Sequence, residues 1–236
     1  MTYNPIICAI DTTNIPEALQ LVRSISPYVG AIKLGLEFFV AHGAEGVKLF
    51  DHFNIPVFLD LKFHDIPNTV AKAIEATAGI DTFMMTVHSA GGRTMLQRAV
   101  EASAKVAQTT GKKRPYVVGV TVLTSMDQDD LSIIGVKHMI DTQVKRLADL
   151  AQSAHLDGVV CSSYEIEMLR RECGDDFLLV VPGIRPEGSA KGDQKRIMTP
   201  CEALDKGADY LVIGRPITQA EEPERAAEAI ARELGV

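Results

Sequence analysis

Two charged residues, Asp60 and Lys62, stand at the end of an apolar stretch and are separated by a single leucine. Side chains alternate along a β-strand, so a strand here places both on one face, about 6–7 Å apart. Charged groups in a partly desolvated place are costly unless they pair with one another. A site that tolerates this cost usually carries chemistry, although a purely structural ion pair is the alternative for these two residues alone.

Charged residues follow other apolar stretches at matching positions. Asp11 follows the first apolar stretch of the chain, and Lys33 lies near the end of the second. If these stretches are neighbouring strands, Asp11 and Lys33 meet Asp60 and Lys62 in a group of two carboxylates and two ammonium ions. For Asp65, capping of the following helix is the structural alternative.

A second group of residues, later in the chain, is suited to binding a phosphate. Gly183 with Arg185, and Gly214 with Arg215, each follow an apolar stretch. Glycine lets the backbone approach an anion, and arginine can donate two parallel hydrogen bonds to it. The polar segment 186–194 is long enough to close over a ligand. The alternative is that Gly214 and Arg215 merely start a helix and that Arg185 is a surface charge.

The apolar stretches and the amphipathic stretches between them predict alternating strands and helices. The strands are rich in Val, Ile and Leu without clean alternation, as expected for strands covered on both faces. The predicted strands are Ile6–Ile10, Ala31–Leu34, Val57–Leu61, Thr82–Val87, Tyr116–Leu123, Gly158–Cys161, Leu178–Val181 and Tyr210–Ile213. The clearest predicted helices are Pro16–Ile25, Gly92–Thr109, Ile140–Ala154 and Pro223–Leu234, with Asn14 and Asp141 as candidate caps.

Eight strand–helix units in 236 residues average about 30 residues each, the size of a βα repeat. No linker divides the chain, so we expect an α/β protein with one domain, residues 1–236, folded as a (β/α)8 TIM barrel. In such barrels the active site lies at the carboxyl ends of the strands, where the charged residues fall. An open doubly wound sheet is the alternative. A Rossmann domain is less favoured, because the first strand is not followed by G-x-G-x-x-G.

The composition excludes several classes of protein. Hydrophobic residues make up 46% of the chain and the formal net charge is −7, which argues against disorder and against a general nucleic-acid binder. No run of about 18 apolar residues suggests a membrane span, and no secretory signal is expected. Cys8 and Cys161 lie in apolar stretches, so buried free thiols and a cytoplasmic location are predicted. No spacing indicates a metal site, and His88 is either catalytic or structural.

These motifs resemble the orotidine 5′-phosphate decarboxylase family. The ten-residue segment Asp60–Thr69 matches the catalytic segment of that family and is highly specific. The resemblance extends along the whole chain through shorter segments at the predicted strand ends, which are Ala9–Asp11, Ile32–Gly35, Val87–His88, Thr121–Ser125, Pro182–Arg185 and Ile213–Pro216.

The resemblance implies a homodimeric barrel that converts orotidine 5′-phosphate to UMP and CO2 in de novo pyrimidine synthesis, with no metal and no organic cofactor. It implies that Lys62 protonates C6 of the pyrimidine and that Asp60 flanks it. Asp65 would flank Lys62 from the partner subunit, and Thr69 would reach the ribose across the interface. The remaining expected contacts are those of Lys33 and Asp11 with the ribose, of Thr124 with the base, and of Pro182, Arg185, Gln194, Gly214 and Arg215 around the phosphate end of the substrate.

Two other functions stay open on the sequence alone. One is a sugar-phosphate decarboxylase or aldolase-type relative, which shares an Asp-x-Lys-x-x-Asp strand but needs a divalent metal. The other is a non-catalytic barrel that binds nucleotide phosphates. Such a barrel needs the arginines but not Lys62 and its carboxylates.

Overall fold

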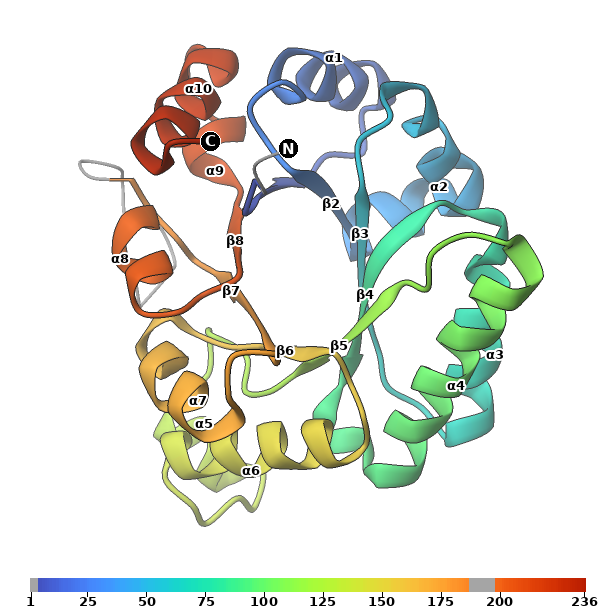
Figure 1. Cartoon of the computed structure of the whole chain (residues 1–236), viewed down its shortest axis with the longest axis vertical. Helices are drawn as coiled ribbons and strands as arrows, with labels where there is room; N and C mark the ends of the chain where they lie inside the picture. Colours follow the sequence, from blue (N-terminus) through green and yellow to red (C-terminus); the bar gives the residue numbers. More distant parts are fainter. Residues whose placement is uncertain (1–3, 187–197) are drawn as a thin grey trace.

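A closed barrel of parallel strands forms the centre of the computed structural model, which describes residues 4–186 and 198–236. β1 pairs with both β2 and β8, so the barrel has no open edge. Helices surround the barrel on the outside (Figure 1). The predicted (β/α)8 barrel is therefore confirmed, and the open doubly wound sheet is wrong.

The strands fall close to their predicted positions. They are β1 (Ile6–Ile10), β2 (Ala31–Gly35), β3 (Val57–Phe63), β4 (Thr82–His88), β5 (Tyr116–Val120), β6 (Gly158–Val160), β7 (Leu178–Pro182) and β8 (Tyr210–Ile213). The helices are α1 (Ile15–Ile25), α2 (Leu36–Lys48), α3 (Pro67–Ala76), α4 (Arg93–Thr110), α5 (Gln128–Ile133), α6 (Ile140–Ser153), α7 (Ile166–Cys173), α8 (Pro200–Asp205), α9 (Arg215–Thr218) and α10 (Pro223–Leu234).

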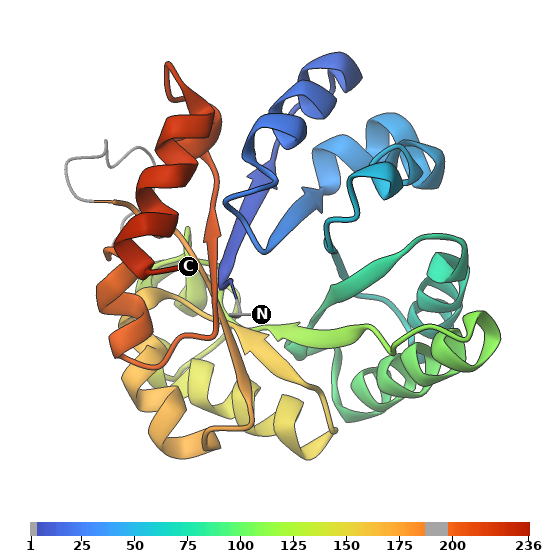
Figure 2. The same cartoon turned by 45° about the horizontal axis from the view of Figure 1, so that its top comes forward.

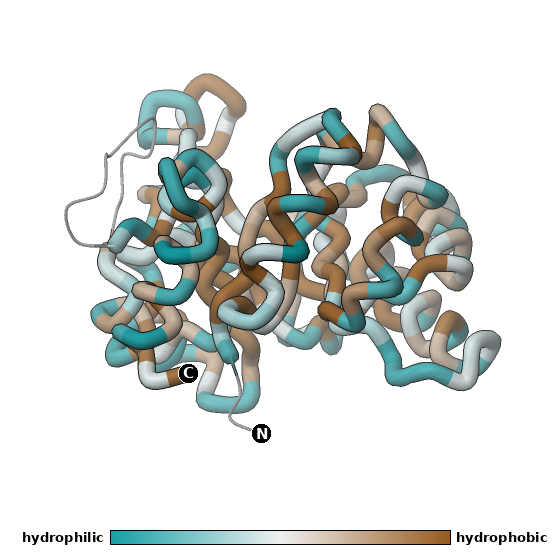
Figure 3. The backbone as a smooth tube through the Cα atoms, turned by 90° about the horizontal axis from the view of Figure 1, so that it is seen from above, coloured by the Kyte–Doolittle hydropathy of each residue, from teal (hydrophilic) through white to brown (hydrophobic). Residues whose placement is uncertain are grey.

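Apolar side chains fill two layers. The inner layer closes the barrel interior and consists of Ile7, Ala9, Ala31, Phe58, Met84, Val118, Val180 and Val212. The outer and larger layer lies between the strands and the helices. Both faces of the strands are thus covered, which explains their lack of alternation in the sequence. In Figure 3 the apolar stretches of the chain lie mainly in the interior, and the hydrophilic ones lie at the outer turns.

The first and last helices complete the outer ring. α10 lies beside α1, and the two helices are in contact (Figures 1 and 2). Asn14 caps α1, as predicted, because its Oδ1 accepts a hydrogen bond of 3.2 Å from the backbone N–H of Glu17. Asp141 is not a cap. The residue before α6 is Met139, and Asp141 lies within the first turn of the helix.

The fifth strand ends earlier than predicted. The stretch Tyr116–Leu123 pairs with β6 as far as Val120, and both the backbone N–H and the hydroxyl of Thr121 donate to the carbonyl of Val160. The next residues leave the ladder and contribute to a pocket at the barrel mouth. Among the helices of the described ranges, none has both the length and the apolar character needed to cross a bilayer.

Candidate functional site

A pocket of about 450 Å³ opens at the carboxyl ends of the strands. Side chains and backbone from β1, β2, β3, β5, β6, β7 and β8 reach it, so its shape depends on closure of the whole barrel. Its lining residues are Ala9, Asp11, Lys33, Phe58, Asp60, Lys62, Val120, Val122, Leu123, Thr124, Val160, Cys161, Pro182, Gly183, Arg185, Val212, Gly214, Arg215, Thr218 and Gln219. This is the end of the barrel at which the sequence predicts the site.

The charged side of the pocket is built around Asp60. Lys62 Nζ lies 2.8 Å from Asp60 Oδ2, and Lys33 Nζ lies 3.5 Å from the same oxygen. Lys33 Nζ is also 3.5 Å from Oδ1 of Asp11, the residue that directly follows β1. The predicted meeting of two carboxylates and two ammonium ions from three strand ends is therefore observed.

The Asp60 carboxylate is almost fully buried, with 8% of the residue exposed. Burial by itself raises the pKa of a carboxyl group. Lys33 and Lys62 outweigh that effect, with help from hydrogen bonds donated by Lys62 and Thr86, so the pKa of Asp60 lies below its ordinary value. Asp60 is thus a fixed negative charge between two positive ones.

The backbone at Lys62 is unusual for a strand. Its φ is +52°, in the left-handed region that side chains other than glycine rarely adopt. The pairing of β3 with β4 shifts register between Leu59 and Phe63, so Lys62 lies in a bulge. Leu59 and Leu61 pack into the outer apolar layer, and Asp60 and Lys62 face the pocket, as the alternation predicts.

Gly35 lies next to the charged group. A side chain at this position would place its Cβ 3.1 Å from Lys33 Nζ and 3.8 Å from Asp11 Oδ1. An alanine here would therefore require a small shift of the Lys33 ammonium ion, which links the two carboxylates.

The side of the pocket formed by β7 and β8, next to β1, carries the predicted phosphate-binding residues. Pro182 ends β7, Gly183 and Arg185 follow it, and Gly214 and Arg215 follow β8. Gly183 has a φ of +81°, which glycine adopts without strain. Arg185 is 6% exposed and donates from Nη1 to the carbonyl of Ile184 at 2.9 Å, so its guanidinium is held in place rather than solvated. The surface-charge interpretation of Arg185 is wrong.

Comparison with known proteins agrees with this geometry. The family model described as orotidine 5′-phosphate decarboxylase / HUMPS matches residues 4–230. The chain belongs to this family. It is 52% identical over 235 residues to the protein named orotidine 5′-phosphate decarboxylase from Rhodospirillum rubrum, covering 99% of this chain and 95% of that protein. A protein of the same name from Moorella thermoacetica is 49% identical and is matched over 97% of this chain and 91% of its own.

Solved structures agree as well. The crystal structure titled orotidine 5′-phosphate decarboxylase from Lactobacillus acidophilus superimposes with a TM-score of 0.88 at 35% identity, covering 99% of this chain and all of that one. A structure of an uncharacterized conserved protein from Geobacillus kaustophilus gives a TM-score of 0.84 at 33% identity, over 97% of this chain and 99% of that one.

Two residues that the family resemblance assigns to the site lie outside this pocket. Asp65 and Thr69 are exposed, at the start of α3, and neither lines the cavity. Asp65 does not cap α3: the residue before the helix is Ile66, and Asp65 Oδ1 accepts instead from the backbone N–H of Ile66 at 2.6 Å. Gln194, expected at the phosphate, falls outside the described residues.

A third side of the pocket is apolar and was missed by sequence reasoning apart from Thr124. It consists of Val122, Leu123 and Thr124 after β5 and of Val160 and Cys161 at the end of β6. The signal was present, since the predicted fifth strand ran into these residues, but a continuous apolar run does not reveal where a strand leaves its ladder.

Histidine and cysteine side chains contribute little to the pocket. His88 ends β4 but does not line the cavity; its ring lies 5.2 Å from that of His64. Burial lowers the pKa of His88, and the nearby His64 and Lys62 lower it further. The negative charge of Asp60 raises this pKa but does not outweigh the other effects. Cys8 and Cys161 are buried free thiols, as predicted. Burial raises the pKa of Cys8 to about 12 and that of Cys161 well above its ordinary value.

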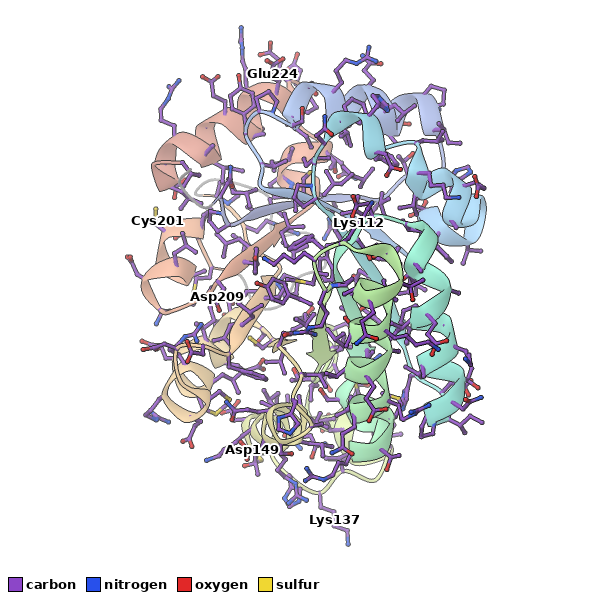
Figure 4. The ribbon with its side chains drawn as sticks, turned by 45° about the vertical axis from the view of Figure 1, so that its right-hand side comes forward. Lys112, Lys137, Asp149, Cys201, Asp209 and Glu224 are labelled. Atoms are coloured by element: carbon purple, nitrogen blue, oxygen red, sulfur yellow. The ribbon has the colours of Figure 1, made fainter. Side chains whose placement is uncertain are left out.

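The other two thiols and the acidic side chains of the described residues form no second site. Cys173 is a buried free thiol at the end of α7. Cys201 lies on α8 at the outer edge of the molecule (Figure 4). Across residues 4–186 and 198–236, no three His, Cys, Asp or Glu side chains gather as metal ligands would.

Asp60→Asn tests the charge balance of the pocket. Because the folded protein lowers the pKa of Asp60, the ionised carboxylate stabilises the fold at neutral pH, and this contribution disappears as the pH falls through the lowered pKa. We expect the variant to lose about 1–3 kcal/mol of unfolding free energy at pH 7. The difference in unfolding free energy between the wild type and Asp60→Asn should stay constant down to about pH 5. Below about pH 4 this difference should become smaller.

Urea unfolding at several pH values measures this difference. Asp176→Asn, which changes an exposed carboxylate before β7, is the matched control and should be neutral. A deficit for Asp60→Asn that is absent at pH 7, or that grows as the pH falls, would contradict the prediction.

Proposed function

We propose that the chain decarboxylates orotidine 5′-phosphate to UMP and CO2 in pyrimidine nucleotide synthesis. The observation that carries this proposal is the Lys62 ammonium ion, held 2.8 Å from the buried Asp60 carboxylate in a pocket that two arginines also line. The names of its relatives in the orotidine 5′-phosphate decarboxylase / HUMPS family support the same reaction.

Lys62 is the proposed proton donor. Loss of CO2 from C6 leaves an anion in the plane of the pyrimidine ring, where the π system stabilises it poorly. A fixed ammonium ion beside that carbon stabilises the developing charge and then delivers a proton to it. Lys62 suits this role because its side chain is partly exposed to the pocket while its nitrogen is anchored by Asp60.

Asp60 and Lys33 are the proposed support of that ammonium ion. The short contact with Asp60 fixes the position of Lys62 Nζ, and Lys33 balances the second charge of the group through Asp60 and Asp11. Positioned charges of this kind act without reorganisation at the moment of reaction. Lys33 and Asp11, at the same side of the mouth, are the proposed ribose contacts.

The arginine side of the pocket is the proposed phosphate site. Arg185 and Arg215 can each offer parallel N–H donors to phosphate oxygens, and Gly214 leaves the backbone accessible. Pro182 and Thr124 also line the pocket, and a pyrimidine ring and its substituents would rest against them. Gln194 remains a proposed phosphate contact on the basis of the resemblance alone.

A homodimer is proposed to complete the site. Asp65 and Thr69 are exposed, and the apolar side chain between them, Ile66, is 68% exposed. The neighbouring helix α2 exposes Leu36 at 54% and Val40 at 82%. Exposed apolar residues around polar ones are typical of a subunit interface. Asp65 and Thr69 would then contribute to the pocket of the partner subunit.

We also propose that no metal or organic cofactor takes part in the reaction. The proposed location of the enzyme is the cytoplasm.

A spectrophotometric assay with orotidine 5′-phosphate decides between the proposed function and its alternatives. Turnover that survives EDTA supports the proposal. Turnover of a sugar phosphate that EDTA abolishes would indicate the metal-dependent relatives instead. Tight UMP binding without turnover of either substrate would indicate a non-catalytic nucleotide-binding barrel.

Lys62→Ala should abolish nearly all turnover. Removal of the proton donor is expected to lower kcat by at least about two decades, or roughly 2.7 kcal/mol of barrier, because no other ammonium ion lies as close to Asp60 Oδ2 among the described residues. UMP binding by calorimetry should change little, since the arginines remain.

Lys137→Ala is the control for the loss of a lysine. Lys137 is exposed and projects away from the barrel (Figure 4). It should retain full activity. More than about one per cent of wild-type kcat in Lys62→Ala would remove Lys62 from the role of proton donor.

Mixed dimers test the sharing of sites. Asp65→Ala and Lys62→Ala subunits should each be nearly inactive alone. If Asp65 acts in the partner's pocket, a mixed dimer contains one pocket with both residues intact, so an equimolar mixture should recover about a quarter of wild-type activity.

Asp60→Ala mixed with Lys62→Ala is the matched control. Both residues line the same pocket of one chain, so no mixed dimer regenerates an intact site. Failure of the Asp65→Ala mixture to recover activity, once mass spectrometry has confirmed subunit exchange, would show that Asp65 does not act across an interface.

A further inference from the structure

The bulge in β3 faces a single residue of β4. Between the paired positions 59↔85 and 63↔87, β3 advances by four residues while β4 advances by two. Only Thr86 lies between the two paired positions on the β4 side. A bulge disrupts the hydrogen bonds of the ladder, and a buried backbone N–H without a partner is costly, so the N–H of Lys62 needs an acceptor from another source.

The side chain of Thr86 supplies that acceptor. Its Oγ1 accepts from the backbone N–H of Lys62 at 2.8 Å and donates to Asp60 Oδ1 at 2.9 Å. A hydroxyl group has one hydrogen and two lone pairs, so both bonds form together. Thr86 is completely buried, and its branched Cβ restricts the hydroxyl to few orientations.

These two bonds close a ring through the proposed reactive group. From the Lys62 N–H the ring passes through Thr86 Oγ1 to one oxygen of Asp60, and from the other Asp60 oxygen to Lys62 Nζ at 2.8 Å. One hydroxyl therefore fixes both the left-handed backbone of Lys62 and the carboxylate that receives its amine. The position of Nζ in the pocket depends on both the backbone conformation of Lys62 and the position of the Asp60 carboxylate.

We infer that Thr86 is a positioning residue, whose hydroxyl sets the place of the Lys62 ammonium ion against the reacting carbon of the substrate. This inference rests on the proposed decarboxylase function. Thr86 does not line the pocket; it acts through Asp60 and Lys62, to which it is hydrogen-bonded. The sequence offers no motif for it, because a threonine inside a strand has many ordinary reasons to be there.

The test compares three variants. Thr86→Val keeps the shape and removes the hydroxyl, whereas Thr86→Ser keeps the hydroxyl. Thr82→Val is the control and makes the same change at the other end of β4. Thr82 is 6% exposed, and its hydroxyl has no hydrogen-bond partner among the described residues. If Thr86→Val does not fold, Thr86→Cys replaces it, because a thiol is a weak donor and acceptor of similar size.

We expect kcat of Thr86→Val to fall about tenfold to a hundredfold, the effect of losing a hydrogen bond to a charged group. KM and UMP affinity should stay within about threefold, because the phosphate side is untouched. Thr86→Ser should lie within about threefold of the wild type and Thr82→Val should match it. A kcat of Thr86→Val within threefold of the wild-type value would overturn the inference. The inference would also fail if kcat and UMP affinity dropped by the same factor in Thr86→Val and if Thr86→Ser showed the same losses.

The pH profile adds a readout that a purely structural role does not move. Asp60 is surrounded by Lys33, Lys62 and Thr86, with Asp11 beyond Lys33 and His88 further along β4. Loss of the Thr86 bond should raise the pKa of Asp60, so the acidic limb of kcat should move to higher pH in Thr86→Val but not in Thr86→Ser. An unmoved limb in Thr86→Val counts against the inference.

Failure of the two proposals can be told apart. A wild type that does not turn over orotidine 5′-phosphate contradicts the proposed function only. Carbon-13 NMR titration of the Asp60 carboxyl then still tests the role of Thr86 on its neighbour: a pKa raised in Thr86→Val but not in Thr82→Val supports it, and equal titration in both variants overturns it.

Discussion

The attraction between the Asp60 carboxylate and two ammonium ions is the interaction on which the site depends. A carboxylate that is 8% exposed is unfavourable by itself, and so are amines at the mouth of an apolar barrel. Each is acceptable only while the others stay in place. The group therefore has one arrangement of low energy, and the strands that carry its members cannot slide past one another without breaking it.

The barrel provides the rigidity that this arrangement needs. An inner layer of apolar side chains, with Phe58 and Val212 among them, lies directly beneath the charged group and also lines the pocket. Close packing below keeps the strand ends at fixed separations, and the low polarity strengthens the attraction between the charges above. Function is thus placed on loops and strand ends while stability comes from the layers beneath.

Periodicity and composition were enough to predict the barrel, and the alternation of Asp60 and Lys62 with leucines was enough to predict which side chains face the mouth. Other features depend on tertiary structure that local sequence does not encode. The bulge at Lys62 and the hydroxyl of Thr86 opposite it arise from how two strands pair. The early end of β5, at Val120, is decided by its partner strand rather than by its own apolar residues.

The two halves of the pocket come from opposite ends of the chain. The charged side belongs to β1–β3 and the arginine side to the turns after β7 and β8, and the two meet only because β8 closes onto β1. A nucleotide that contacts both sides would link the N-terminal strands β1–β3 to the C-terminal strands β7 and β8. Its binding energy would then oppose opening of the β1–β8 seam, so that occupancy by substrate or product protects the enzyme from heat and proteolysis as well as serving the reaction.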